Sequence, residues 1–164
     1  MAHPFIFSVV SMAIVKTPCI GICSTTSFGD AVCRGCKRYS FEVINWNGYA
    51  DEAKIAVLKR IEKLSCQILE NKLRIYSVSK LQQALEQQQV PFDPSLSPYC
   101  WLHNLLKKAH QQLNTLEEVG VAALPEFADT ALPALCELIE QELLLLCDAH
   151  YARYYEASSA RQLR

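Results

Sequence analysis

The sequence predicts a mainly α-helical protein in which an N-terminal four-cysteine metal knuckle precedes a helical bundle. Apolar residues recur at intervals of three and four through most of the chain, as on the buried face of a helix. Glycine is scarce, with 5 residues in 164, which disfavours a β-rich fold. Four of the 8 cysteines lie within residues 19–36. The formal charge of −1 gives no general attraction to nucleic acid or to acidic membranes.

Residues 1–16 are expected to be a leader ahead of the folded part. Their apolar run is short and no Lys or Arg precedes it, which is unlike a secretory signal peptide, and Met12 is an alternative start of translation. No uncharged run approaches the ~20 residues of a membrane span. We therefore expect a cytoplasmic protein, with no membrane partner, in which clustered thiols stay reduced and bind metal.

Residues 17–90 are predicted to form the metal-binding module with a long helix. Ser40 is expected to cap a short helix over 41–46, and Asp51 a longer one over 52–73. One face of the longer helix carries Val57, Ile61, Leu64 and Ile68. Residues 74–79 alternate as a strand would, but a lone strand has no evident partner, so we favour a helix or a break there.

Ser79 is then expected to cap a helix over 80–89. Residues 91–98 contain three prolines, which no helix tolerates, and they predict a linker and the main boundary of the chain.

Residues 99–164 are predicted to form a C-terminal helical region. A helix over 99–113 is followed by a weaker helical turn or two over 116–124. The last helix is expected over 131–156, capped at position 129 or 130. The apolar face of the first of these helices carries Leu102, Leu105, Leu106, Ala109 and Leu113.

The strongest functional signal is the spacing C-x3-C-x9-C-x2-C, formed by Cys19, Cys23, Cys33 and Cys36. Two close cysteine pairs joined by a short loop can supply the four soft donors of a tetrahedral metal site. Gly35 is expected to take a positive φ that turns both sulfurs of the second pair inward. Four thiols in a turn-rich segment favour metal over disulfides or unligated thiols.

The identity of the metal stays open between zinc and an iron–sulfur cluster, since both use four thiolates. The spacing matches neither common ferredoxin pattern and leans toward zinc. Cationic residues flank the site and would stabilise bound thiolates. They are Lys16, Arg34, Lys37 and Arg38.

Residues 17–61 resemble a small bacterial family of unknown function whose members carry P-C-x-G-x-C, C-x-G-C-x-R and E-I-x-x-W. The positions that match are Cys19, Cys23, Cys33, Cys36, Arg38, Glu42 and Trp46. Val43-Ile44 is a mild departure from the family pattern. The family is commonly labelled a predicted iron–sulfur protein, so the resemblance implies a four-cysteine metal site in a bacterial cytosolic protein, but no reaction.

Two weaker sets of residues have alternative interpretations. Arg34, Lys37 and Arg38 could contact nucleic acid together with Trp46 and Phe41, although these aromatic residues more simply pack in the core. The two C-x2-H pairs, one on each of two helices, could form a second metal site, although they also continue apolar stripes. Those pairs are Cys100 with His103 and Cys147 with His150. Cys66 is interpreted as a core residue.

No catalytic motif was found, and the glutamates of the C-terminal half, including Glu137, Glu140 and Glu142, fit solvated helix faces. We therefore expect a small non-enzymatic metal-binding protein that serves as an accessory module and docks an unidentified protein partner. The alternatives are an iron–sulfur electron-transfer or redox-sensing protein, and a nucleic-acid- or ribosome-associated binder.

Overall fold

The computed structural model describes residues 14–156 and 158, so most of the expected leader lies outside the described residues. Within them the fold is mainly α-helical, as predicted. The helices are α1 (Ser24–Phe28), α2 (Ser40–Asn45), α3 (Asp51–Glu70), α4 (Val78–Gln87), α5 (Pro98–Ala109) and α6 (Leu132–Tyr151). The strands are β1 (Leu73–Ile75) and β2 (Val121–Ala123). Short 3-10 turns follow α2 and α5 and flank β2, and a π-helical turn, Ala152–Glu156, continues α6.

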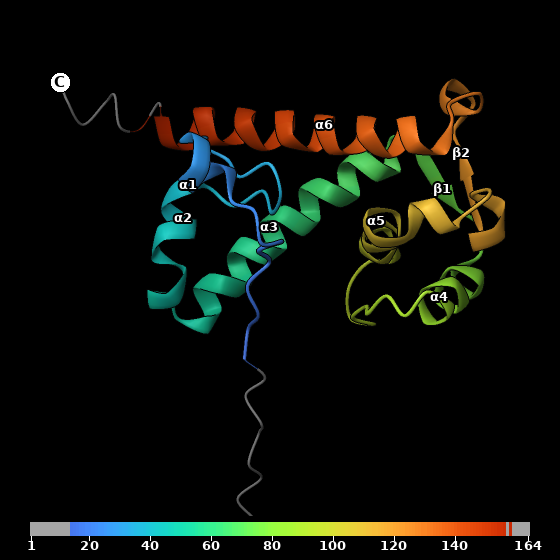
Figure 1. Ribbon diagram of the computed structural model, residues 1–164, viewed down its shortest axis with the longest axis horizontal. Helices are drawn as coiled ribbons and strands as arrows, with labels where there is room; N and C mark the ends of the chain where they lie inside the picture. The colour runs from blue at the N-terminus through green and yellow to red at the C-terminus, as the bar shows by residue number, and fades with distance from the viewer. Residues whose placement is uncertain (1–13, 157, 159–164) are drawn as a thin grey trace, which may run out of the picture.

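Helix α6 runs along one side of the molecule, and α3 crosses beneath it (Figure 1). Helices α1 and α2 lie under the C-terminal end of α6, whereas α4, α5 and the two strands lie toward its N-terminal end. Helix α3 packs against both α5 and α6, and therefore connects these two groups of elements. The cysteine-rich segment thus sits at one end of a helical frame.

The hydrophobic core is built from the predicted apolar faces. Leu69 of α3, Leu102 and Leu105 of α5, and Ile139 and Leu143 of α6 are all essentially inaccessible to solvent. Burial of such side chains stabilises a fold by roughly 1.5–3 kcal/mol each. The core draws on both sides of the proline-rich segment 91–98, so the helices before and after this segment share one apolar interior.

The two strands correct the preference for a helix or a break at residues 74–75, and of the helical turns predicted over 116–124 only the 3-10 turn Glu117–Val119 is present. They pair antiparallel, with Leu73 opposite Ala123 and Ile75 opposite Val121. The backbone N–H groups of Tyr76 and Ser77 then both donate to the Gly120 carbonyl, at 3.0 and 3.1 Å. The error arose because the partner strand is distant in sequence, and no local pattern reveals such a partner.

Helices α2 and α3 begin one residue earlier than predicted. Ser40 and Asp51 are the first residues of α2 and α3 rather than the residues before them. Tyr39 precedes α2, and its backbone N–H donates to Glu42 Oε2 at 2.8 Å, which satisfies a donor that the first turn leaves open.

The predicted caps of α4 and α6 are wrong. Ser77, not Ser79, precedes α4, and its side chain accepts the N–H of Lys80 at 3.4 Å. Helix α6 follows Ala131, which makes no side-chain cap, so neither of residues 129–130 occupies the predicted position. In the part of the chain that is described, no helix combines the length and apolar character needed to traverse a bilayer.

Candidate metal centre

The second cysteine pair lies in a tight hairpin, residues 33–36, which we call the knuckle. Both Cys33 and Cys36 are buried. The Cys33 N–H donates to the Arg38 carbonyl at 2.8 Å, and the Lys37 N–H donates to the Cys33 carbonyl at 2.8 Å. These bonds close the turn and hold the two thiols on its inner side.

The backbone of the knuckle differs from the expectation in one respect. The left-handed residue is Lys37, with φ 62°, and not Gly35. The Ile20 side chain lies over Gly35, since a Cβ at position 35 would lie 2.6 Å from Cδ1 of Ile20. The close approach of Ile20 shows that the segment between the first two cysteines packs directly on the knuckle. Gly21, with φ 97°, takes the positive φ that suits glycine.

The thiol of Cys33 is surrounded by backbone donors. Burial on its own would raise the pKa of Cys33, but hydrogen bonds from the backbone N–H groups of Cys36, Ser24 and Gly35 lower it to about 6. Burial raises the pKa of Cys36. The hydrogen bond that Arg38 Nε donates to its sulfur at 3.3 Å lowers this pKa, but by less than burial raises it. At neutral pH Cys33 is therefore the sulfur of this pair that is largely a thiolate.

The first cysteine pair is less constrained than the second. Cys23 directly precedes α1 and is half-buried, and its sulfur lies 2.9 Å from Thr25 Oγ1. Cys19 is exposed, and its sulfur accepts the Gly21 N–H at 3.4 Å. Ser24 links this segment to the knuckle through its side-chain oxygen, which accepts the Arg34 N–H at 2.9 Å.

Among residues 14–156 and 158, no three Cys, His, Asp or Glu side chains are gathered closely enough to hold an ion. The structure thus brings the thiols of Cys33 and Cys36 together and places the chain around Cys23 against them. It leaves the Cys19 sulfur at the surface. Four thiols are a donor set suited to a soft ion, and those of the first pair are the more exposed members of the set.

The three cations next to the knuckle have very different surroundings. Arg34 is exposed and pairs with Asp30 at 2.8 Å. Lys37 is 2% exposed, and Arg38 is 3% exposed and lies over the Trp46 ring at 4.7 Å. Trp46 is itself buried, which confirms the core interpretation of this residue. Of these three cations only Arg34 faces solvent, so they do not form the continuous basic surface that nucleic acid would contact.

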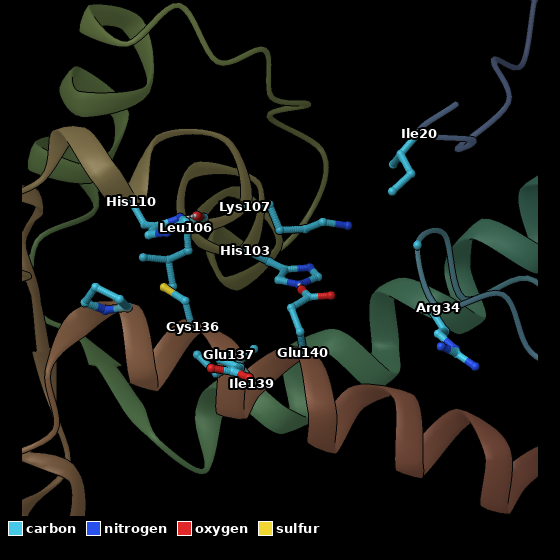
Figure 2. A pocket seen from close by; sticks show the side chains of 12 residues that line it. Ile20, Arg34, His103, Leu106, Lys107, His110, Cys136, Glu137, Ile139 and Glu140 are labelled. Atoms are coloured by element: carbon cyan, nitrogen blue, oxygen red, sulfur yellow. Dashed lines mark hydrogen bonds and ion pairs between the residues drawn. The ribbon is translucent and has the colours of Figure 1, made fainter. Parts of the chain in front are cut away.

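A partly exposed carboxylate of α6 links the residue after the knuckle to the helical core. Glu140 of α6 lies 2.7 Å from Lys37 Nζ through Oε2 and 2.7 Å from His103 Nε2 through Oε1. Figure 2 shows the His103 and Glu140 side chains directed toward one another. Burial would raise the pKa of Glu140, but hydrogen bonds from His103 and Lys37, with the charge of Lys37, lower it to about 2.

The Glu140 side chain is 34% exposed, so it still reaches the solvated face that the sequence predicts, but the sequence missed its partners Lys37 and His103. A signal for its inward position was present in the sequence, because Cys136, Glu140, Leu143 and Cys147 follow the three-and-four spacing of one helical face. Glu142 is 38% exposed, as expected for a solvated helix face, and it pairs with the buried Lys72.

A cavity of about 360 Å³ adjoins this contact between the knuckle, α5 and α6. Ile20 and Gly35 line it on the knuckle side, and Leu106 and Ile139 form part of its apolar wall (Figure 2). The exposed Lys107 borders the same space. The knuckle is thus open to small groups on the side that faces the helices.

The residues of the predicted second metal site have separate contacts. The set is Cys100, His103, Cys147 and His150. The Cys100 sulfur lies 2.9 Å from that of Cys66, whereas His103 is held by Glu140. Cys147 is fully buried in the core. The contact between Cys100 and Cys66 joins two residues far apart in sequence, and no spacing pattern pointed to it.

Residues 17–65 match the model of a protein family described as a protein of unknown function, DUF1289. The match covers less than a third of the chain, and it contains all four clustered cysteines together with α1, α2 and most of α3. The predicted resemblance to a small uncharacterised family is thereby supported, whereas the iron–sulfur label stays a prediction. No curated protein and no solved structure matched the chain.

Proposed function

We propose that the chain is a non-catalytic metal-binding module in which Cys19, Cys23, Cys33 and Cys36 bind one metal centre. The observation that carries the proposal is the burial of Cys33 and Cys36 in one tight hairpin, where backbone N–H groups of Ser24, Gly35 and Cys36 lower the pKa of Cys33. Such donors stabilise a thiolate before any ion arrives. Two of the three come from the knuckle itself, and the third comes from the residue that follows Cys23.

The surroundings of the knuckle support a negatively charged tetrathiolate centre. Four thiolates with a divalent ion carry a net charge near −2, and Arg38 donates to the Cys36 sulfur at 3.3 Å while packing on Trp46. A bound zinc ion would supply a rigid cross-link, and an iron–sulfur cluster would add electron transfer. The first pair would complete the set, because Ile20 and Ser24 already tether it to the knuckle.

Exposed apolar side chains on the same module support a docking role. Ile20, Ile22, Phe28 and Ile44 are each at least 60% exposed. Large exposed apolar side chains that cluster in one segment mark interaction surfaces more often than chance placement. Metal binding would order the loop that carries Ile20, Ile22 and Phe28, and so couple metal occupancy to the binding of a protein partner.

The first test is metal analysis of the full chain purified without oxygen. We expect one centre per chain, either one colourless zinc ion or a brown iron–sulfur chromophore that oxidant bleaches. A colourless zinc protein rejects the electron-transfer alternative, and a brown protein supports it. Protein from a metal-replete culture that contains neither zinc nor iron with sulfide would overturn the proposal.

The second test is limited proteolysis of Cys33→Ser, with Cys136→Ser as the matched control. Because metal binding contributes folding free energy to the segment that it ties together, Cys33→Ser should raise protease sensitivity near residue 30 and leave α3 to α6 protected. Cys136 lies in α6 outside the knuckle, so its replacement should not change the cleavage pattern. Equal patterns for both variants would contradict a metal-dependent fold.

A further inference from the structure

Two cysteines outside the knuckle meet between α3 and α5. The sulfurs of Cys66 and Cys100 lie 2.9 Å apart, closer than two sulfur atoms without a hydrogen bond or a covalent bond approach. Both are free thiols, and Cys66 is half-buried whereas Cys100 is buried. A disulfide needs the sulfurs at about 2.05 Å, so a small movement within the existing helix packing would suffice.

The position of the pair favours reaction at one of the two sulfurs. Cys100 is the third residue of α5, and the Ser97 side chain that caps this helix also hydrogen-bonds to Cys66. Cys66 is therefore near the positive end of α5, which stabilises a thiolate. The hydrogen bond from Cys100 lowers the pKa of Cys66, and the same contact together with burial raises the pKa of Cys100.

We propose that Cys66 and Cys100 form a thiol–disulfide exchange site that reacts with small disulfides such as oxidised glutathione. The Cys66 thiolate attacks one sulfur of the small disulfide, which forms a mixed disulfide and releases one small thiolate. Cys100 then loses its proton and attacks the Cys66 sulfur, which closes the Cys66–Cys100 bond and releases the second small thiol. Two protein thiols are oxidised, and one small disulfide is reduced to two thiols.

The bond would connect the two sides of the proline-rich segment. It would close a loop that contains β1, α4 and residues 91–98, and it would fasten α3 to α5 at the place where they already pack. Disulfides of cytosolic proteins are mostly transient and redox-responsive. This site therefore reports the redox state of the small-thiol pool independently of metal at the knuckle.

The test is peptide mapping of the native full chain after incubation in buffers of stepped reduced-to-oxidised glutathione ratio, followed by alkylation and trypsin. We expect a disulfide-linked pair of peptides, residues 64–72 and 81–107, each of which contains one of the two cysteines. The same titration in urea should yield at least ~10-fold less of this link at a given ratio, because the unfolded chain no longer holds the thiols together.

Single variants separate the roles of the two sulfurs. Cys100→Ser should leave Cys66 carrying one stable glutathione, whereas Cys66→Ser should leave Cys100 unmodified because it is buried. Cys136→Ser should form the link as the unmodified chain does. Absence of the linked peptides from the native unmodified chain under excess oxidised glutathione overturns the proposal, and so does a yield of link that is equal in the native and the urea-unfolded chain.

Discussion

Replacing Glu140 by glutamine removes the negative charge that lies between Lys37 and His103. The Lys37 side chain is only 3% exposed, so in the variant its ammonium group would be buried without a carboxylate. Breaking a buried ion pair from one side costs ~3–5 kcal/mol. The Lys37 ammonium keeps its hydrogen bond to the Arg34 carbonyl at 2.6 Å, and the Glu140 side chain is 34% exposed, so we expect the lower value of ~2–3 kcal/mol.

The pH dependence gives a second estimate of the free energy that the Glu140–Lys37 contact contributes to stability. The pKa of Glu140 is lowered from 4.5 to about 2 in the folded protein. A group with a depressed pKa stabilises the fold above its unfolded value, and the stabilisation is lost as the pH falls toward the folded value. The shift corresponds to ~3 kcal/mol, which solvent screening reduces to ~2 kcal/mol. The two estimates agree.

The assay is thermal and urea unfolding of the wild type and Glu140→Gln, followed by circular dichroism from pH 6 to pH 3. At pH 6 we expect the variant to melt ~5–10 °C lower. At pH 3 the difference in unfolding free energy should shrink by about half, because Glu140 is protonated on unfolding. Glu137→Gln, one turn earlier and hydrogen-bonded to the exposed Gln141, is the control and should lie near the wild type. An equal effect of both substitutions, or a difference that does not change with pH, would refute the reasoning.

Further substitutions test the strand connection and the core. Gly120→Ala should destabilise the protein by ~2 kcal/mol or more, because a Cβ would lie 2.4 Å from the Ser77 carbonyl oxygen at a φ of 74°. Gly29 has the same φ, but the space around it is open, so Gly29→Ala should lower the unfolding free energy in urea by only ~1 kcal/mol. Equal losses of stability in the two glycine variants would exclude the steric explanation. Leu105→Ala should lower the unfolding free energy by ~2–5 kcal/mol, whereas Leu145→Ala, at a 67% exposed position, should change it by less than ~0.5 kcal/mol. Similar effects of the two leucine substitutions would contradict the assignment of the core.

Much of the fold followed from local patterns. The faces of α3 and α5 were correctly assigned from apolar spacing, and Leu64, Ile68, Leu102 and Leu105 are buried as that spacing predicts. Pro133 lies in the first turn of α6, where its missing N–H removes no helical hydrogen bond. These features depend on residues three or four positions apart, and such information is contained in the sequence itself.

The candidate site was predictable only in part. The sequence identified the four clustered cysteines, and the structure places Cys33 and Cys36 in one tight hairpin, whereas their role as metal ligands stays a prediction. It misassigned the positive φ to Gly35 instead of Lys37, because glycine tolerates this backbone conformation best and the hairpin geometry was not visible from the sequence. It also did not reveal that Glu140 pairs with Lys37 and His103, since these partners lie far from Glu140 in the sequence.

The amino-acid sequence by itself determined the helices, their apolar faces and the concentration of cysteine in one short segment. Only the tertiary structure decided that β1 pairs with β2, that Glu140 meets Lys37, and that Cys66 meets Cys100. Each of these contacts joins residues at least 34 positions apart. Their geometry depends on how α3, α5 and α6 pack on one another, and this packing is a property of the whole core that no local pattern contains.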